Sequence, residues 1–382
     1  MQSVKRKLVR NLGIARLPIN LGQRYPMTAC SFFKSVVSLY RMKPSFVRSR
    51  ATGRITLADV ARAAGVSPIT VSRALRGERA VDPELVARVQ TAVCKLGYKP
   101  NPAARALASG VGTHVAVMIP MLSNALFVDL LEAIQRTLRH DGYQTLIGVT
   151  HYDPAEEEML LREQLLHRPA GLLITGLERN DATRTLIAQS GVPCVHLMEA
   201  SGTANVYSVG FSQTNAGADL TRHLRVRGYQ RIAFAAAQLD PRTLQRLDGW
   251  RREMQSAGLY NTSLEWLNPA PSSISLGARM FEQIMGQQPA VDAIFFCNDD
   301  LAQGALLAAL RLGIAVPQRV AVAGFNDLTG SDQMLPTLTT VRTPRAEIGH
   351  AAAAMLLALM RGESVDSPCI DLGYELLVRD ST

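Results

Sequence analysis

The sequence lacks the features that mark secreted, membrane and metal-binding proteins. No two of its five cysteines have the spacing of a metal or redox motif, so buried, reduced thiols are expected. No apolar run approaches the roughly 18 residues that a membrane-spanning helix needs. The basic amino end is followed by neither an apolar core nor a small-residue cleavage site, so it is a poor signal peptide. These absences predict a cytoplasmic protein with no membrane partner.

Signatures of catalysis are missing too. The sequence contains no GxGxxG or Walker phosphate loop, no HExxH motif and no nucleophile elbow. Its seven histidines are scattered along the chain, which argues against a metal cluster. An α/β enzyme would need a reactive group of side chains, and none is evident. We therefore expect no cofactor and no enzymatic activity.

What the sequence does have is a marked separation of charge. Residues 1–50 hold 11 Lys and Arg residues and no acid, whereas residues 111–382 hold 21 basic and 28 acidic residues. A basic amino end on an acidic body is typical of polyanion binding. Residues 1–53 show no helical or strand periodicity. We expect a disordered basic extension, a start placed upstream of the true one at Met42, or an arm that contacts DNA.

Residues 54–100 carry the start and stop signals of short helices. Thr56 and Asp59 have the spacing of a capping box, and Gly65 supplies a sharp turn after the first helix. The Ser67-Pro68 pair then opens a second helix. Two helices joined by a glycine turn and braced by a third predict a helix-turn-helix domain. A generic three-helix bundle would share these signals.

The same cap-then-proline signal appears twice more. Asp82-Pro83 opens the third helix, which should end near Gly97, and Asn101-Pro102 opens a helix of barely two turns within residues 101–112. A helix this short is marginal alone in water. It should form only when it packs against a second copy of itself or against DNA. Residues 101–112 are therefore a candidate hinge and switch.

The stretches LADVARAAGVSPITVSRAL (57–75) and GYKPNPAARALA (97–108) resemble the headpiece and hinge of the LacI/GalR family of bacterial repressors. The resemblance continues to the carboxyl end. It implies that the second helix enters the major groove of DNA. It also implies that the hinge helices of two subunits insert paired leucines, here Leu107, into the minor groove.

The resemblance further implies that positions 68, 69 and 73 face the bases. Pro68 and Ile69 cannot form side-chain hydrogen bonds, although Ile69 could contact a thymine methyl group. Arg73 is then the side chain that can read a guanine edge, with a discrimination of roughly 1–3 kcal/mol. The remaining polar residues should cap helices or contact phosphates, which positions the domain without specifying sequence. These residues are Thr56, Ser67, Thr70, Ser72 and Asn101.

Within residues 113–382 the pattern changes to short apolar runs separated by amphipathic helices. Continuous apolar strands alternating with helices predict parallel sheets covered on both faces. So many units predict two doubly wound subdomains, like those of periplasmic binding proteins, with a cleft between them. The chain is thus an α helix-turn-helix headpiece joined to an α/β core. The expected strands are 115–119, 145–149, 171–175, 194–198, 232–236, 293–297 and 320–325.

Ligands of doubly wound sheets bind at the carboxyl ends of the strands, so the residues just after each strand predict an effector site. Each alone is equally well explained as a helix cap. We expect Asp299 or Asp300 to cap the helix after Asn298 rather than to bind a metal. The expected lining comprises Ser123, Asn124, Phe127, Thr175, Glu178, Glu199, Gln238, Asp240, Arg242, Asn298, Asp299, Asn326 and Asp327.

The family resemblance implies that Arg246 grips a small effector. Arg242, one turn earlier on the same face, replaces a smaller polar residue, and Asn326 stands where an aspartate usually holds sugar hydroxyls. The cleft thus gains a cation and loses an anion, which favours an acidic ligand unless Arg242 points to solvent. The stretches HLMEA, VGFSQTNAG and LDPRT resemble gluconate-utilisation repressors. We expect a sugar acid such as gluconate or a ketogluconate; a neutral sugar or another small metabolite is the alternative.

A hinge helix that needs a partner predicts a homodimer on a palindromic operator. The chain ends in a strand-like segment and not in the heptad helix by which some family members form tetramers. Effector binding should change the angle between the lobes and hence operator affinity, with a coupling of about 1–3 kcal/mol. A periplasmic-type sugar-binding protein would share the two lobes. It would need an export signal and would have no use for residues 55–109.

Substitution of the inserted leucine should separate DNA binding from effector binding. Leu107→Ala should abolish tight operator binding, because the hinge pair loses its minor-groove contact, and should leave effector binding intact. A mobility-shift assay and a ligand titration on one preparation measure both properties. Loss of both would contradict this division of labour.

Overall fold

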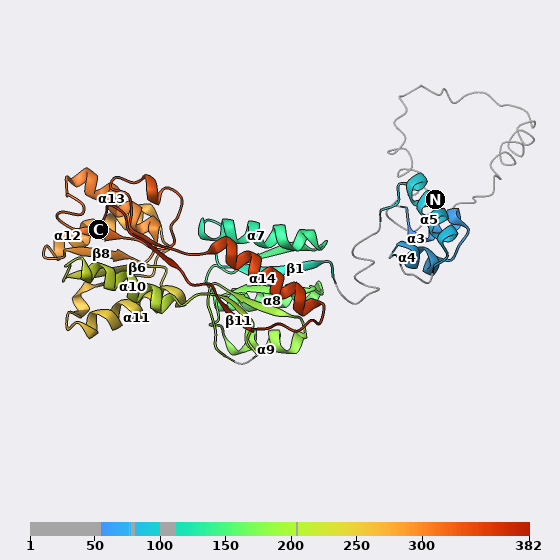
Figure 1. The fold of residues 1–382 in the computed structure, drawn as a ribbon, viewed down its shortest axis with the longest axis horizontal. Coiled ribbons are helices and arrows are strands. Elements are labelled where there is room, and N and C mark those ends of the chain that lie inside the picture. The colour runs from blue at the N-terminus through green and yellow to red at the C-terminus, as the bar shows by residue number, and fades with distance from the viewer. Residues whose placement is uncertain (1–54, 76, 78–80, 100–111, 204) are drawn as a thin grey trace, which may run out of the picture. The chain divides into compact units, whose positions relative to one another are not determined.

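The computed structural model describes residues 55–75, 77, 81–99, 112–203 and 205–382 (Figure 1). The chain divides between Lys99 and Pro100 into two units. Residues 1–54 and most of the expected hinge, with Asn101 and Leu107, lie outside the described residues. No helix in the described part of the chain is both long and apolar enough to cross a membrane.

The first unit contains the three predicted helices, α3 (Leu57–Ala64), α4 (Pro68–Leu75) and α5 (Pro83–Leu96). The capping box is confirmed: the amide of Thr56 donates to Asp59 Oδ2 at 2.9 Å, and Thr56 Oγ1 accepts from the amide of Asp59 at 3.4 Å. Gly65 and Gly97 end α3 and α5 in the left-handed conformation that favours glycine. The helices pack around a small apolar core of Val60, Ala61, Ala64, Val71, Ala74, Val89, Ala92 and Tyr98.

The second unit holds two lobes, and the first lobe is built on a parallel six-stranded sheet. Its strands are β1 (His114–Ile119), β2 (Gln144–Val149), β3 (Gly171–Thr175), β4 (Cys194–Leu197), β5 (Ser208–Gly210) and β11 (Cys369–Asp371). Its helices are α7 (Leu126–His140), α8 (Pro154–Leu166), α9 (Asp181–Ser190) and α14 (Arg345–Met360). The strand order is β11-β5-β4-β3-β1-β2. Alternate residues of β1 face opposite sides, so Val117 packs with α7 and α14 and Met118 packs with α8 and α9.

The second lobe is built on a parallel four-stranded sheet in the order β7-β6-β8-β9. Its strands are β6 (Ile232–Ala237), β7 (Glu265–Asn268), β8 (Ala293–Phe296) and β9 (Ala321–Ala323). Its helices are α10 (Gln213–Val226), α11 (Pro241–Ser256), α12 (Ile274–Gln287) and α13 (Asp299–Leu312), with 3-10 turns η1 (Thr262–Leu264) and η2 (Ser331–Gln333). A further antiparallel pair joins β10 (Thr340–Arg342) to β12 (Glu375–Leu377). The doubly wound α/β core is therefore confirmed.

The chain crosses between the lobes in three places (Figure 1). The first crossing joins β5 to α10, the second joins β10 to α14, and the third joins β11 to β12. Each lobe therefore contains segments from both halves of the core sequence. The two lobes can change their relative angle only by bending at these connections.

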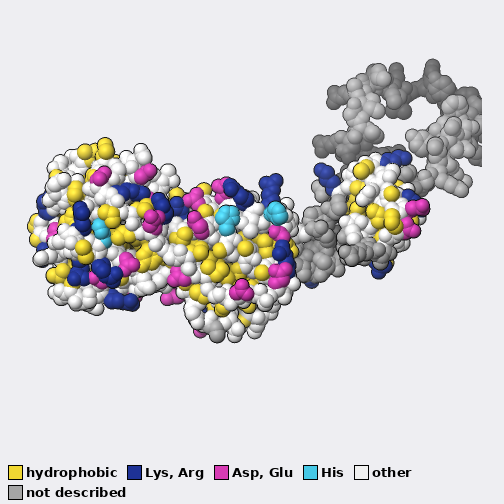
Figure 2. Space-filling model, viewed as in Figure 1, with side chains coloured by type: hydrophobic (Ala, Val, Ile, Leu, Met, Phe, Trp, Pro, Cys, Tyr) yellow, Lys and Arg dark blue, Asp and Glu magenta, His cyan; other side chains and the backbone are white. Residues whose placement is uncertain are grey.

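The expectation that every strand is covered on both faces is wrong for β2. This strand lies at the edge of its sheet, and Leu146 and Ile147 are 39% and 41% exposed. By contrast, α14 belongs to the core. It packs against α7 and buries Ile348, Ala352 and Leu356, although the face of the lobe where α14 lies still shows hydrophobic side chains (Figure 2).

Glycines set the distance between neighbouring helices of the second lobe. A Cβ atom added at Gly277 of α12 would lie 2.1 Å from the carbonyl oxygen of Leu301, and one added at Gly304 of α13 would lie 2.0 Å from that of Ile274. Gly249 of α11 approaches the carbonyl oxygen of Thr214 equally closely. These helices pack backbone against backbone, with no room for a methyl group.

Two alanine substitutions in α12 should act in opposite directions. Gly277→Ala should lower the free energy of unfolding by about 1–3 kcal/mol because the helices are forced apart. Gly286→Ala, on the same helix with nothing within 4 Å of its added Cβ, should raise it by about 0.5–1 kcal/mol. Urea denaturation of the two variants measures both effects. Equal free energies of unfolding for the two variants would show that α12 can move away from α13 without loss of stability.

Candidate effector cleft and DNA-binding helix

The second helix of the headpiece, α4, exposes one side while its other side is buried. Ser67 caps it, because its Oγ accepts from the amide of Thr70 at 3.1 Å; the two hydroxyl groups also lie 2.8 Å apart. Ile69 is 65% exposed, whereas Val71 is fully buried. Of the other residues expected to face DNA, Pro68 and Arg73 are exposed, and Thr56, Thr70 and Ser72 are half-buried. This arrangement leaves positions 68, 69 and 73 accessible to a groove.

The core contains two adjoining cavities, and Tyr152 lines both. Cavity 1 holds about 590 Å³ of empty space and cavity 2 about 720 Å³, each partly open to solvent. Of the residues expected from the sequence, cavity 1 is lined by Thr175, Glu178, Glu199, Asp240 and Arg242. Cavity 2 is lined by Ser123, Asn124, Gln238 and Asn298. Phe127, Arg246, Asn326 and Asp327 line neither cavity.

Arg242 is buried in cavity 1, with 6% of its surface exposed, so the alternative that it points to solvent is wrong. Its Nε donates to Asp240 Oδ1 at 3.3 Å, and its guanidinium carbon lies 5.9 Å and 5.8 Å from the ring centroids of Phe127 and Tyr152. Its Nη1 is buried and has no hydrogen-bond partner among the described residues. An unpaired buried donor costs free energy, which a bound acceptor would recover.

Asp240 offsets part of the positive charge that Arg242 brings. It caps α11 by accepting from the amide of Arg242 at 3.1 Å, and it accepts from Thr243 Oγ1 at 2.9 Å. Burial alone would raise the pKa of Asp240, but Arg242 and Arg246 outweigh burial and hold that pKa below its usual value. The carboxylate is therefore ionised at neutral pH, and the cleft gains less net positive charge than Arg242 alone would supply.

Arg246 lies behind the cavities and joins several parts of the second lobe. It is 3% exposed; its Nε donates to Gln213 at 2.9 Å, and its Nη1 donates to the carbonyl of Cys297 at 2.6 Å and to Asn298 Oδ1 at 2.9 Å. Its guanidinium stacks 3.9 Å from the ring centroid of Phe325. Asn298 Oδ1 also accepts from Asn326 Nδ2 at 3.0 Å, while Asn326 Oδ1 is buried without a partner.

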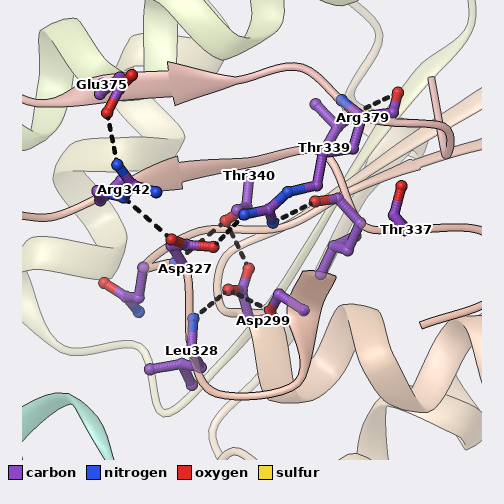
Figure 3. Close-up of polar contacts among 12 residues, drawn as sticks. Asp299, Asp327, Leu328, Thr337, Thr339, Thr340, Arg342, Glu375 and Arg379 are labelled. Atoms are coloured by element: carbon purple, nitrogen blue, oxygen red, sulfur yellow. Dashed lines mark hydrogen bonds and ion pairs between the residues drawn. The ribbon is translucent and has the colours of Figure 1, made fainter. Parts of the chain in front are cut away.

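The expectation that Asp299 or Asp300 caps α13 is wrong. Asn298 occupies the cap position without a side-chain cap bond, and Asp299 is turned toward the loop after β9 and toward β10. Its carboxylate accepts from the amide of Leu328, Ser331 Oγ and Thr340 Oγ1 at 2.7–2.8 Å (Figure 3). Burial raises the pKa of Asp299 to about 6, because these donors only partly offset it.

Asp327 is also turned away from both cavities. It pairs with Arg342 at 3.1 Å and with Arg379 at 2.7 Å, as Figure 3 shows. Together with Asp299 it fixes the loop at 326–331 to the segments that cross between the lobes. Residues Leu328 and Thr329 of this loop line cavity 2. Asp299 and Asp327 therefore hold the loop that contributes to the lining of cavity 2.

The backbone after the strands that end at the cleft is held in an unusual conformation. Non-glycine residues with positive φ follow β2, β4, β6 and β9. A positive φ costs a non-glycine residue on the order of 1–3 kcal/mol. The conformation persists where contacts with surrounding residues impose it. The residues are His151, Tyr152, Met198, Gln238, Leu239, Asn326 and Asp327.

Tyr152, which was not predicted from the sequence, lies in the wall shared by both cavities. Burial raises its pKa to about 12, so its hydroxyl stays protonated and can donate a hydrogen bond. The rule that ligands bind at the carboxyl ends of parallel strands could have identified Tyr152, because this residue lies three positions after the end of β2. Cavity 2 also contains Ser272, Asp300 and Gln303, none of which follows a predicted strand directly. Ser272 lies in the loop before α12, and Asp300 and Gln303 lie in the first residues of α13.

Arg179 is a further buried cation at cavity 1, but its hydrogen bonds are used within the protein. It pairs with Glu157 at 3.0 Å, and its Nη2 donates to the carbonyl of Gly176 at 3.0 Å. It also lies 2.8 Å from His196 Nδ1. Burial, aided by Arg179, lowers the pKa of His196 to about 4, so this histidine is neutral at physiological pH.

An exposed recognition helix on one unit and a two-lobed core with a polar cleft on the other define a ligand-responsive DNA-binding regulator. The model of bacterial regulatory proteins of the lacI family matches residues 56–101, and that of the periplasmic binding protein-like domain matches residues 221–382. The HTH-type transcriptional regulator GntR of Pseudomonas aeruginosa is 53% identical over 334 residues, covering 87% of this chain and 97% of that protein. The chain belongs to the LacI family of transcriptional regulators.

Solved structures agree with this assignment. The transcription regulator GntR from Chromobacterium violaceum is 47% identical with a TM-score of 0.69, covering 70% of this chain and 98% of that one. The lac repressor dimer bound to operator and the anti-inducer ONPF is 25% identical with a TM-score of 0.76, covering 86% and 99%. The relatives are regulators of transcription and not enzymes.

Substitutions on the two sides of α4 should separate DNA contact from folding. Ile69→Ala should weaken operator binding by about 10-fold or less with no loss of headpiece stability, because an exposed side chain loses only its base contact. Val71→Ala, which empties part of the small core, should lower headpiece stability. Mobility shifts and thermal melts of both variants make the comparison. Unchanged operator binding by Ile69→Ala would remove this residue from the DNA interface.

Proposed function

We propose that this regulator is a repressor whose affinity for a palindromic operator is controlled by a sugar acid, such as gluconate or a ketogluconate, bound in the cleft. The observation that carries the proposal is the unpaired, buried Nη1 of Arg242 in cavity 1. A ligand carboxylate supplies the missing acceptor in a charge-assisted hydrogen bond. The relatives named GntR agree with the resemblance to gluconate-utilisation repressors.

The residues around this donor suit a polyhydroxylated chain. Thr175, Glu199 and Asp240 offer oxygen atoms in cavity 1, and Gln238 brings a buried, unpartnered Oε1 to cavity 2. Hydroxyl groups of a sugar acid can donate to such acceptors while the carboxylate meets Arg242. In this proposal Ser123, Asn124 and Asn298 contact the ligand from cavity 2. Phe127, Arg246 and Asn326 support the lining from behind.

Exposed leucines support a homodimer. Leu307 and Leu310 of α13 are 49% and 68% exposed, and Leu335 is 78% exposed. In the first lobe the edge strand β2 leaves Leu146 and Ile147 accessible. Apolar side chains of this size on a surface suit a subunit interface. The dimer would bring two headpieces, residues 54–100, and two hinges, residues 101–112, to a twofold operator in the cytoplasm, with residues 113–382 as the effector-binding and dimerisation domain.

Arg345 provides a direct link between the lobes. Its Nη2 donates to Asp129 of α7 in the first lobe at 2.9 Å, and its Nη1 donates to the carbonyl of Asn326 in the second lobe. The same loop carries residues of cavity 2. A ligand that shifts this loop would alter the lobe angle and so the pairing of the hinge helices. For a regulator of sugar-acid breakdown, release from the operator on effector binding is the expected direction.

Ligand titration of the purified protein tests the effector class. Gluconate or 2-ketogluconate should bind in preference to glucose and release the operator in a mobility-shift assay. Arg242→Met should weaken gluconate binding by about 10- to 100-fold, because a hydrogen bond to a charged group is worth roughly 1.5–3 kcal/mol. Arg311→Met, an exposed arginine of α13, is the matched control and should bind normally. Preference for a neutral sugar would overturn the sugar-acid assignment.

A further inference from the structure

Cavity 2 contains one charged side chain among the described residues that line it, the carboxylate of Asp300. Its Oδ1 accepts from Ser272 Oγ at 2.8 Å and from the amide of Leu301 at 2.9 Å. Its Oδ2 accepts no hydrogen bond from any described residue. The side chain is half-buried at the amino end of α13. Asp300 is therefore held in place through one oxygen and has the other available.

A positive charge, that of Arg242, lies in the neighbouring cavity. Arg242 lines cavity 1, Asp300 lines cavity 2, and Tyr152 lines both. Arg242 has an unpaired buried donor, and Gln238 beside Asp300 in cavity 2 has an unpaired buried acceptor. A ligand that satisfies both is an acid at one end and an alcohol at the other.

The carboxylate of Asp300 predicts different fates for two related ligands. One hydroxyl group of a sugar chain can donate to Asp300 Oδ2 while a neighbouring hydroxyl group donates to Gln238 Oε1. A second carboxylate or a phosphate at that end would instead face Asp300 with like charge and would carry no donor for Gln238. Like charges placed together in an interface are strongly unfavourable.

We propose that Asp300 makes the cleft select sugar acids with a single carboxylate, by accepting the hydroxyl group at the far end of the ligand and excluding a second anionic group there. This inference rests on the proposed sugar-acid function and deepens it. Ser272 acts as a positioning residue, because its hydroxyl fixes the carboxylate of Asp300. The cleft then distinguishes the two ends of its ligand, with Arg242 reading the acid and Asp300 reading the alcohol.

Binding of gluconate and glucarate, which differ only in the group at carbon 6, tests the inference by calorimetry on the full-length protein. The wild-type protein should prefer gluconate by at least about 10-fold. Asp300→Asn removes the charge and keeps an oxygen that can accept from Ser272 and Leu301, so the variant should fold normally. It should bring the two affinities within about threefold, chiefly by improving glucarate binding. A thermal melt of each variant checks the fold.

Glu132→Gln is the matched control, because it removes one acidic charge from the exposed surface of α7, outside the linings of both cavities. It should leave the preference for gluconate unchanged. Equal binding of gluconate and glucarate by the wild-type protein would overturn the role of Asp300 while leaving the sugar-acid function standing. An unchanged preference in Asp300→Asn, or an equal loss of preference in Glu132→Gln, would overturn it as well. Failure of gluconate to bind at all would overturn the proposed function, and this inference with it.

Discussion

The cleft depends on the burial of one cation, the guanidinium of Arg246. An isolated buried charge costs several kcal/mol, and here no carboxylate is bonded to it. The charge is instead distributed over Gln213, the carbonyl of Cys297, Asn298 and the face of Phe325. These groups come from α10, from the end of β8 and from the segment after β9. The guanidinium therefore holds the back wall of the cleft together, and movement of any of these segments would break one or more of its contacts.

A second constraint connects this wall to the crossings between the lobes. Asp299 binds the loop at 326–331 and also Thr340 of β10, which leads directly into the crossing before α14. Asp327, in the same loop, binds Arg342 of β10 and Arg379, which follows β12. Arg345 then joins that loop to α7. A continuous set of hydrogen bonds thus runs from the loop that lines cavity 2 to the first lobe.

Much of this architecture could be predicted from the sequence, because its signals are local. The caps at Thr56 and Ser67, the glycine turns and the continuous apolar strands each specify their own segment. The rule that ligands meet strand ends also placed Arg242 and Asp240 at the cleft. The rule says where a residue lies along a strand and not where its side chain points. It therefore could not show that Arg242 is paired with Asp240, that Asp327 turns toward arginines, or that Phe127 and Arg246 lie behind the lining.

The residues that the sequence did not reveal depend on contacts between distant segments. Asp299 looked like a helix cap, because its partners Ser331 and Thr340 are far along the chain. Asp300 needs Ser272, from the loop before α12, to fix its carboxylate. Neighbours of this kind follow from the packing of α12 against α13. That packing depends on Gly277 and Gly304, whose role no periodicity of apolar residues indicates.

The order of the strands has a consequence for synthesis on the ribosome. The sheet of the first lobe receives its last strand, β11, and its covering helix, α14, only after all four strands of the second lobe's sheet have been made. Until then the nascent first lobe presents the apolar side of β3, β4 and β5 to the solvent. The first lobe therefore cannot finish folding before the second lobe emerges, and its exposed intermediate is a natural client for chaperones. Neither lobe can be completed on its own, because the last residues of the chain return to the second lobe.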